Sequence, residues 1–97
     1  MKITWSPLAL ERVNDIVDYI AQENLEAAER LAIELFGAVE RLEKFPESGR
    51  VIPELSRSTI REIIYKKYRI LYRIEAKQIA ILTVRHVRQQ FQSDELI

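Results

Sequence analysis

Residues 60–87, IREIIYKKYRILYRIEAKQIAILTVRHV, decide the fold of this chain of 97 residues. The stretch is rich in Ile, Val and Tyr, which favour β-strands. It is interrupted at Lys66-Lys67 and again at residues 75–78. These breaks predict three strands, at residues 60–65, 68–74 and 79–87. Because the connections between them are short, we expect neighbouring strands to pair in an antiparallel meander.

The middle strand predicts a sheet with two different faces, because successive side chains of a strand point to opposite sides. One face carries Tyr68, Ile70, Tyr72 and Ile74. The other carries Arg69, Leu71 and Arg73. We expect helices to cover the aromatic and aliphatic face, and the arginine face to meet solvent or a ligand. In the third strand, residues 79–82 are apolar on both faces, which is typical of a central strand.

The residues before this stretch predict a short strand and two helices. Residues 2–5 alternate as a strand does, and Ser6-Pro7 is a typical helix start, with Ser as the cap and Pro in the first turn. Apolar residues then recur at helical spacing up to Ile20 and again from Leu25 to Leu42. The short connection at Asn24 predicts an antiparallel helical hairpin.

These elements predict one α+β domain over residues 1–97. In it, an N-terminal β-strand and the two-helix antiparallel hairpin pack on one face of an antiparallel β-sheet. Residues 50–58 have no clear period and are expected to form a loop. Residues 88–97 are expected to form one helical turn or to fray.

Composition excludes several kinds of chemistry. The chain has no cysteine and a single histidine, His86, so thiolate metal sites, disulfides and cysteine nucleophiles are ruled out. It also lacks glycine-rich phosphate loops and paired metal-binding histidines. We therefore expect no metal and no cofactor.

No apolar run is long enough to span a membrane, and the N-terminus has no signal-peptide pattern, so we expect a cytoplasmic protein that makes no membrane contact.

The formal net charge of zero conceals two oppositely charged halves. Residues 1–49 contain 5 basic and 10 acidic residues, a net of −5, whereas residues 50–97 contain 10 basic and 5 acidic residues, a net of +5. Such asymmetry indicates an anionic partner, although the two halves could equally pair with each other in the fold.

The basic half places several arginines near the only histidine. The set is Arg61, Arg69, Arg73, Arg85, His86 and Arg88. Guanidinium groups can hold a phosphodiester, and an imidazole can move the proton of a ribose 2′-hydroxyl, so this set suits metal-free RNA cleavage. Alternatively, these charges form solvated strand edges or bind the carboxylates of a partner.

Motifs spread over most of the chain resemble the RelE/ParE superfamily of toxins from type II toxin–antitoxin systems, and in particular its ParE-like branch. The motifs are Trp5, Asp15-Ile16-x-x-Tyr19-Ile20-Ala21, Leu42-x-x-Phe45-Pro46-x-x-Gly49-Arg50, Tyr68-Arg69-Ile70-Leu71-Tyr72 and Ile81-Leu82-Thr83-Val84-x-His86-x-Arg88. The resemblance implies a toxin that is neutralised by a cognate antitoxin, in a complex of the two proteins.

The superfamily implies two alternative activities. ParE-like members inhibit DNA gyrase, and RelE-like members cut messenger RNA on the ribosome. The second activity would use Arg69, His86, Arg61 and Arg88 as catalytic residues. Val87 follows His86, and no Tyr occurs after Tyr72, so the C-terminal tyrosine of several ribonuclease members is missing, which favours the ParE-like branch.

An acidic antitoxin would suit the arginine face of the sheet. We expect Arg69, Leu71, Arg73 and Arg85 to bind the antitoxin or the target, with Leu71 exposed for contact.

Overall fold

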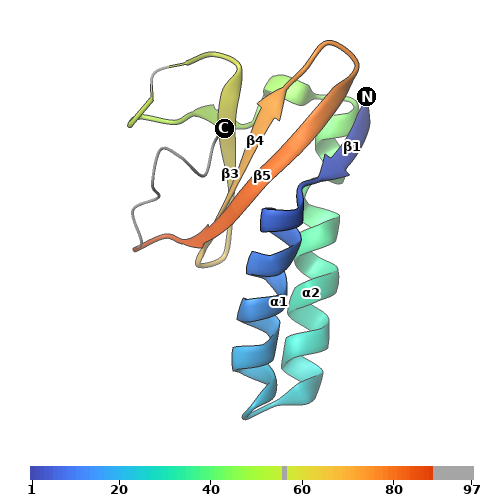
Figure 1. Cartoon of the computed structure of the whole chain (residues 1–97), viewed down its shortest axis with the longest axis vertical. Helices are drawn as coiled ribbons and strands as arrows, with labels where there is room; N and C mark the ends of the chain where they lie inside the picture. The colour runs from blue at the N-terminus through green and yellow to red at the C-terminus, as the bar shows by residue number, and fades with distance from the viewer. Residues whose placement is uncertain (56, 89–97) are drawn as a thin grey trace.

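The computed structural model describes residues 1–55 and 57–88 and shows two helices packed on a mixed five-stranded sheet (Figure 1). The strands are β1 (Lys2–Trp5), β2 (Arg50–Val51), β3 (Ile60–Tyr65), β4 (Tyr68–Ile74) and β5 (Gln78–His86). The helices are α1 (Pro7–Ala21) and α2 (Leu25–Ala38), followed by the 3-10 turns η1 (Glu40–Glu43) and η2 (Pro46–Ser48). The expected α+β fold is confirmed. The expectation for the C-terminal end concerns residues 89–97, which lie outside the described residues.

The sheet has the order β1-β5-β4-β3-β2. Strands β3, β4 and β5 form the expected antiparallel meander, and β5 is an interior strand between β1 and β4. Strand β1 pairs with β5 in parallel, with Trp5 opposite Ile81, so the sheet is mixed rather than wholly antiparallel. The reason is topological, since the hairpin carries the chain from β1 across the sheet before the meander begins.

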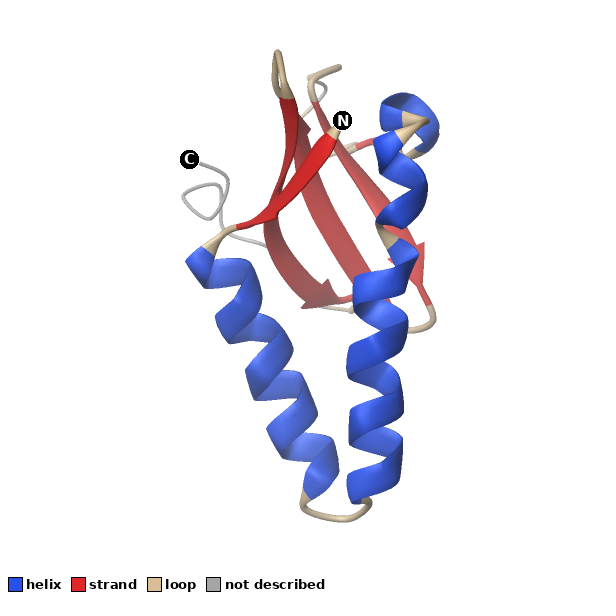
Figure 2. Cartoon of the chain, turned by 90° about the vertical axis from the view of Figure 1, so that its right-hand side faces the viewer, coloured by secondary structure: helices blue, strands red, loops and turns tan. Residues whose placement is uncertain are grey.

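Both helices begin at side-chain caps, the first of them at Ser6 as predicted. The Ser6 hydroxyl accepts a hydrogen bond from the Ala9 amide, and the Asn24 side chain accepts one from the Ala27 amide. The helices run side by side and in opposite directions on one face of the sheet (Figure 2). α2 ends at Ala38, earlier than its apolar pattern suggests, because the chain tightens into the 3-10 turn that keeps Leu42 buried.

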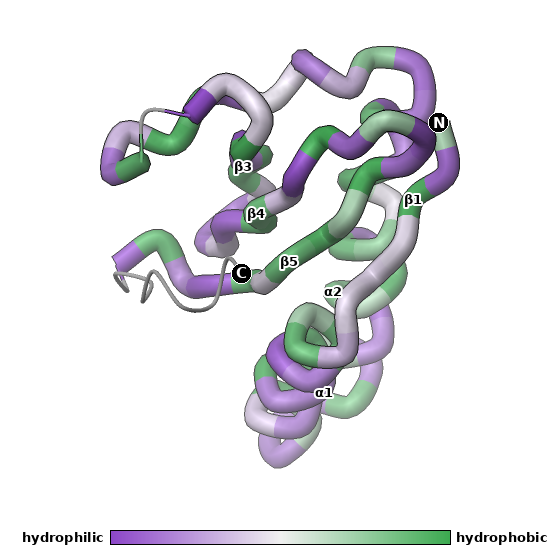
Figure 3. The backbone as a smooth tube through the Cα atoms, turned by 45° about the horizontal axis from the view of Figure 1, so that its top comes forward, coloured by the Kyte–Doolittle hydropathy of each residue, from purple (hydrophilic) through white to green (hydrophobic). Residues whose placement is uncertain are grey.

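The main core lies between the hairpin and the sheet. From the hairpin it contains Val13 and Leu35, and from β4 it contains Ile70 and Tyr72, which confirms the predicted aromatic and aliphatic face. The hydrophobic course of β5 between its neighbours is visible in Figure 3.

A second, smaller core lies on the opposite face of the sheet. It consists of Ile52, Ile60, Leu71 and Leu82, with Leu55 packed against it. The segment after β2, expected to be an open loop, therefore covers part of the face that was predicted to meet solvent.

A register shift in β5 divides its side chains between the two cores. Leu71 pairs with Thr83, but the next residue of β4, Tyr72, pairs with Ile81, which leaves Leu82 as an extra residue in β5. Consequently Ile79, Ile81 and Val84 all join the main core, whereas Leu82 joins the second.

Candidate functional site

Arg69 lies at the centre of a buried ionic network on the second face of the sheet. Its Nε donates to Glu62, and its two terminal nitrogens donate to the two carboxylate oxygens of Glu54 at 3.1 and 3.2 Å. Glu62 is fully buried and also accepts a hydrogen bond of 2.6 Å from the Nε of Arg50. The network therefore joins β2, β3 and β4 to the segment that covers them.

The ionic network shifts the protonation of its members. The hydrogen bond from Arg69 lowers the pKa of Glu54 below its ordinary value. Burial alone would lower the pKa of Arg69, but the hydrogen bonds to Glu54 and Glu62 outweigh it and raise that pKa. Both partners thus remain charged at neutral pH, and the paired hydrogen bonds match the planar fork of a guanidinium.

The prediction that Leu71 is exposed for partner contact is wrong. Leu71 is fully buried, and Arg69 is only 7% exposed. The physical cause is the second core, in which Ile52 and Leu55 pack over Leu71. The alternation of β4 correctly placed both residues on the face away from the helices, but it gave no sign that a loop covers that face.

The other two residues expected to bind a partner lie nearer the edges of the network. Arg73 is half-buried, and its Nη2 lies 2.9 Å from Glu75. Arg85 on β5 stands directly opposite Arg69 in the strand register, but its side chain lines a pocket beside α1 together with Arg12.

Arg61 stabilises a turn of the backbone. In the strand register it pairs with Tyr72, whose side chain lies in the main core on the helix-covered face of the sheet. Its guanidinium donates to the carbonyl oxygens of Ser58 and Gly49, each at 3.0 Å. Beside it, the Tyr72 hydroxyl donates to the Pro46 carbonyl at 2.6 Å and accepts from the Gly49 amide at 3.0 Å. Burial raises the pKa of Tyr72, which keeps the phenol protonated and able to donate.

His86 lies at the end of β5, on the side of the sheet that faces α1. Its ring meets Tyr68 edge-on at a centroid distance of 6.0 Å, and its Nδ1 accepts a hydrogen bond of 3.1 Å from the amide of the exposed Arg88. Strict alternation from Leu82 would have placed His86 on the Arg69 face. The extra residue in β5 places it on the opposite one.

Of the four residues expected to be catalytic under the ribonuclease hypothesis, only His86 and Arg88 lie together. Arg69 and His86 lie on opposite faces of the sheet. Arg61 pairs with Tyr72, whereas His86 pairs with Tyr68. Four residues along a strand correspond to about 13 Å, so Arg61 and His86 are also far apart on the face that they share.

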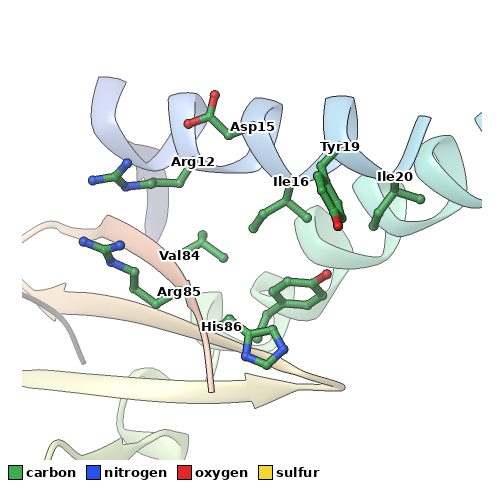
Figure 4. Close-up of a pocket in the computed structure, with 9 residues that line it drawn as sticks. Arg12, Asp15, Ile16, Tyr19, Ile20, Val84, Arg85 and His86 are labelled. Carbon is green, nitrogen blue, oxygen red and sulfur yellow. The ribbon is translucent and has the colours of Figure 1, made fainter. Parts of the chain in front are cut away.

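Side chains of α1 and β5 form a pocket of about 350 Å³ that the sequence did not reveal (Figure 4). α1 contributes Arg12, Ile16 and Tyr19, and the end of β5 contributes Arg85 and His86. The pocket exists because β1 ends at Trp5, opposite Ile81, so the last part of β5 extends beyond β1 and faces α1.

Sequence reasoning also missed the anionic members of the ionic network, Glu54 and Glu62. One signal was available for Glu62. It occupies a strand position between Ile60 and Ile64, where an acidic residue among apolar ones indicates either a solvated face or a buried ion pair. Nothing in the sequence around Glu54 indicates its bond to Arg69.

The structure defines a small α+β protein, and comparison with known sequences identifies its family. Residues 3–91 match the family described as the ParE toxin of the type II toxin–antitoxin system parDE. The chain belongs to this family, and hence to the toxins of type II toxin–antitoxin systems within the ParE/RelE superfamily.

Two relatives align over most of the chain. One is "Putative toxin Y4kP" of Sinorhizobium fredii, 38% identical over 93% of this chain and 92% of the relative. The other is the toxin RelE2 of Caulobacter vibrioides, 34% identical over 88% of this chain and 93% of the relative.

Solved structures share the fold at lower sequence identity. A chain of the chromosomal ParDE system from Pseudomonas aeruginosa gives a TM-score of 0.74 at 20% identity, over 89% of this chain and 95% of that one. A chain of the RelBE2 toxin–antitoxin complex from Mycobacterium tuberculosis gives a TM-score of 0.54 at 24% identity, over 88% of this chain and 95% of that one.

In the part of the chain that the structure describes, no helix is both long and apolar enough to cross a membrane.

Proposed function

We propose that this protein inhibits DNA gyrase and is neutralised by a cognate antitoxin. The observation that carries the proposal is the commitment of Arg69 to Glu54 and Glu62, on the face opposite His86. A metal-free ribonuclease needs a guanidinium and a proton-transfer group at one phosphate, and these residues do not supply that arrangement. Membership of the ParE family and its structural likeness to the ParDE chain support the same branch.

Gyrase inhibition requires a binding surface rather than a catalytic constellation. A protein that acts by binding can tolerate arginines that are engaged within its own fold, because specificity then comes from shape and from surface charge. The antitoxin is the second part of the proposal, and it follows from family membership together with the toxin–antitoxin complexes among the structural neighbours.

The direct test is a supercoiling assay with purified gyrase and this protein in a dilution series. We expect loss of supercoiling, or accumulation of cleaved DNA, at micromolar protein, and reversal of either effect by the antitoxin encoded in the adjacent reading frame. A heat-denatured sample of the same protein is the control. Unchanged supercoiling without cleaved DNA would contradict gyrase inhibition.

A second experiment separates the two branches in cells. The protein is expressed from an inducible promoter while incorporation of labelled thymidine and of labelled methionine is followed. Gyrase inhibition predicts that DNA synthesis falls first, whereas ribosome-dependent RNA cleavage predicts an immediate fall in protein synthesis. The latter result would favour the RelE-like alternative.

A further inference from the structure

The side of the helical hairpin that points away from the sheet carries an exposed row of residues on α2 (Figure 2). Leu25, Glu29, Ile33 and Gly37 follow one another at intervals of four residues, so they share one face of the helix. Ile33 comes two residues before the buried Leu35, which is about 200° around the helix, so this face points away from the core. Leu25 is 63% exposed and Ile33 is 73% exposed, which makes the row an apolar surface in contact with water.

An aromatic pair extends this row near the end of α2. Phe36 is 40% exposed, and the centroid of its ring lies 4.7 Å from that of Trp5, with the two rings tilted by 59°. Trp5 itself packs against the main core, so it supports Phe36 while part of the Phe36 ring stays in water. Aromatic side chains in well-packed surroundings are typical anchors of protein interfaces, and a partner that removes them from water gains binding energy.

Gly37 is a glycine that the fold itself does not require. A Cβ at this position would meet nothing within 4 Å, and its φ is not positive, so neither packing nor backbone geometry calls for glycine. Glycine nevertheless destabilises a helix relative to alanine. Since Gly37 directly follows Phe36 and lies four residues after Ile33, the missing side chain allows another backbone to approach the apolar row. Gly37 is therefore a second, independent observation that points to a partner.

The same side of the hairpin is acidic. Residues 7–38 contain 2 basic and 7 acidic residues, a net charge of −5. Both basic residues, Arg12 and Arg30, line cavities on the side that faces the sheet, as do Asp15 and Glu34. The other five carboxylates of the hairpin are exposed and line neither of these cavities: Glu11, Asp18, Glu23, Glu26 and Glu29. The apolar row is therefore surrounded by negative charge.

We propose that gyrase binds to the outer hairpin face, defined by Leu25, Glu26, Glu29, Ile33, Phe36 and Gly37. The inference rests on the proposed function and names the surface through which this protein exerts it. An enzyme that binds DNA presents cationic surfaces to the phosphates, and the carboxylates of the outer hairpin face are complementary to a surface of that kind. Ile33 and Phe36 supply an apolar centre, and the carboxylates supply a charged rim that accelerates association at low salt.

A cationic protein surface fits the outer hairpin face better than a second copy of this chain or a nucleic acid. In a symmetric dimer through this face, Glu26 and Glu29 of one copy would meet the same carboxylates of the other, and like charges in contact repel. The phosphates of a nucleic acid would be repelled by the same carboxylates.

The test combines the supercoiling assay with binding of the full-length protein to immobilised gyrase. Three variants alter exposed residues of the outer hairpin face: Ile33→Gln removes the apolar centre, Glu29→Lys reverses a charge, and Gly37→Leu fills the space above the helix. We expect each to raise the concentration for half-inhibition about tenfold, with a matching loss of affinity. Binding by the unaltered protein should also weaken as the salt concentration rises.

Gly37→Leu separates a binding role from a structural one. Leucine is a much better helix former than glycine, and its side chain would enter open space, so the melting temperature should rise. Inhibition of gyrase should nevertheless fall, because the leucine keeps the partner from approaching. A residue with a merely structural role would not lose activity while the protein gains stability.

Two matched variants serve as controls. Ile64→Gln changes an isoleucine of β3 that is 50% exposed, and Glu47→Lys reverses an exposed charge in η2. Neither residue belongs to the outer hairpin face, so both variants should inhibit gyrase within about twofold of the unaltered protein. Circular dichroism checks that every variant is folded.

Three outcomes would overturn the proposal. In the first, the outer-face variants inhibit gyrase as the unaltered protein does, which leaves the proposed function intact but places the contact elsewhere. In the second, the same variants lose affinity for the antitoxin encoded in the adjacent reading frame while inhibition is unchanged. In the third, the protein alone sediments as a dimer that Ile33→Gln dissociates, again with unchanged inhibition. If the unaltered protein itself neither binds nor inhibits gyrase, the proposed function fails, and this inference fails with it.

Discussion

Arg69 meets Glu54 through two parallel hydrogen bonds, so the guanidinium that a phosphate would need is already held by a carboxylate of the same chain. Glu54 comes from the segment after β2, which also brings Ile52 and Leu55 over the second face of the sheet. The pairing of Arg69 with Glu54 therefore explains why the arginine face, which the alternation of side chains in β4 predicts to be a ligand surface, is covered.

Replacement of Glu62 is expected to be among the most destabilising single changes in the protein. Glu62→Ala would leave the buried Arg69 without one of its partners and would release Arg50, at a cost of about 3–5 kcal/mol. Urea unfolding followed by circular dichroism measures the change. The matched control is Glu75→Ala, whose partner Arg73 is half-exposed and whose loss should cost about 1 kcal/mol or less. Equal losses for the two variants would contradict a stabilising role for the buried network.

The two glycines are expected to respond in opposite directions to alanine. A Cβ at Gly49 would lie 2.6 Å from both the Glu62 carbonyl oxygen and the Tyr72 hydroxyl, so Gly49→Ala forces backbone and ring apart and should cost about 1–3 kcal/mol or more. A Cβ at Gly37 meets nothing within 4 Å, so Gly37→Ala should stabilise α2 by about 0.5–1 kcal/mol. Thermal melting of the two variants checks both signs, and a tolerated Gly49→Ala would mean that the turn relaxes without loss.

Removal of one oxygen atom at Tyr72 is expected to loosen the turn formed by η2. Tyr72→Phe keeps the ring in the main core but leaves the Gly49 amide without its acceptor and the Pro46 carbonyl without its donor. The expected cost is about 1–3 kcal/mol, together with faster hydrogen exchange at the Gly49 amide. Tyr65→Phe is the control, since Tyr65 does not bind this turn. An unchanged exchange rate at Gly49 would show that water replaces the hydroxyl.

Acid is expected to weaken the link between Glu54 and Arg69. Because the pKa of Glu54 is lowered in the folded protein, its stabilising contribution is present above its ordinary value of 4.5 and is lost as pH falls through the folded pKa. The difference in unfolding free energy between the unaltered protein and Glu54→Gln should therefore be larger at pH 7 than at pH 3. Urea titrations at the two pH values measure it, and comparison with the variant removes the contributions of Glu34 and Glu75, whose pKa values are also lowered. A constant difference would mean that the pair contributes nothing as an ion pair.

Loss of the imidazole is expected to leave toxicity intact. His86 lies on the face opposite Arg69, so His86→Ala should not change growth arrest if the protein acts by binding gyrase. The measurement is colony formation after induction, with protein levels compared by immunoblot. Loss of toxicity at an equal protein level would favour the ribonuclease alternative.

The hairpin and the meander were predictable because their signals are local. Ser6 and Asn24 cap the helices as their positions suggest, and the two-residue break at Lys66-Lys67 marks the turn between β3 and β4. Such features depend on residues a few positions apart, so the pattern of the sequence contains them.

The candidate site was predicted less well because its geometry depends on distant residues. The burial of Leu71 depends on Ile52 and Leu55, which carry no pattern that places them over the sheet. The pocket between α1 and β5 depends on the packing of α1 against the end of β5, and on β1 being too short to cover that end.

The sequence by itself determined the order of the elements, the family and the separation of an acidic helical half from a basic strand half. Only the tertiary structure decided on which face of the sheet each charged side chain lies and which partner it binds. One extra residue in β5 turns His86 away from Arg69, because side chains alternate strictly along a strand and a single insertion exchanges the two faces. The segment that contains Glu54 then closes the arginine face, since burying Leu71 removes apolar surface from water, and Glu54 and Glu62 pair the guanidinium that is buried with it.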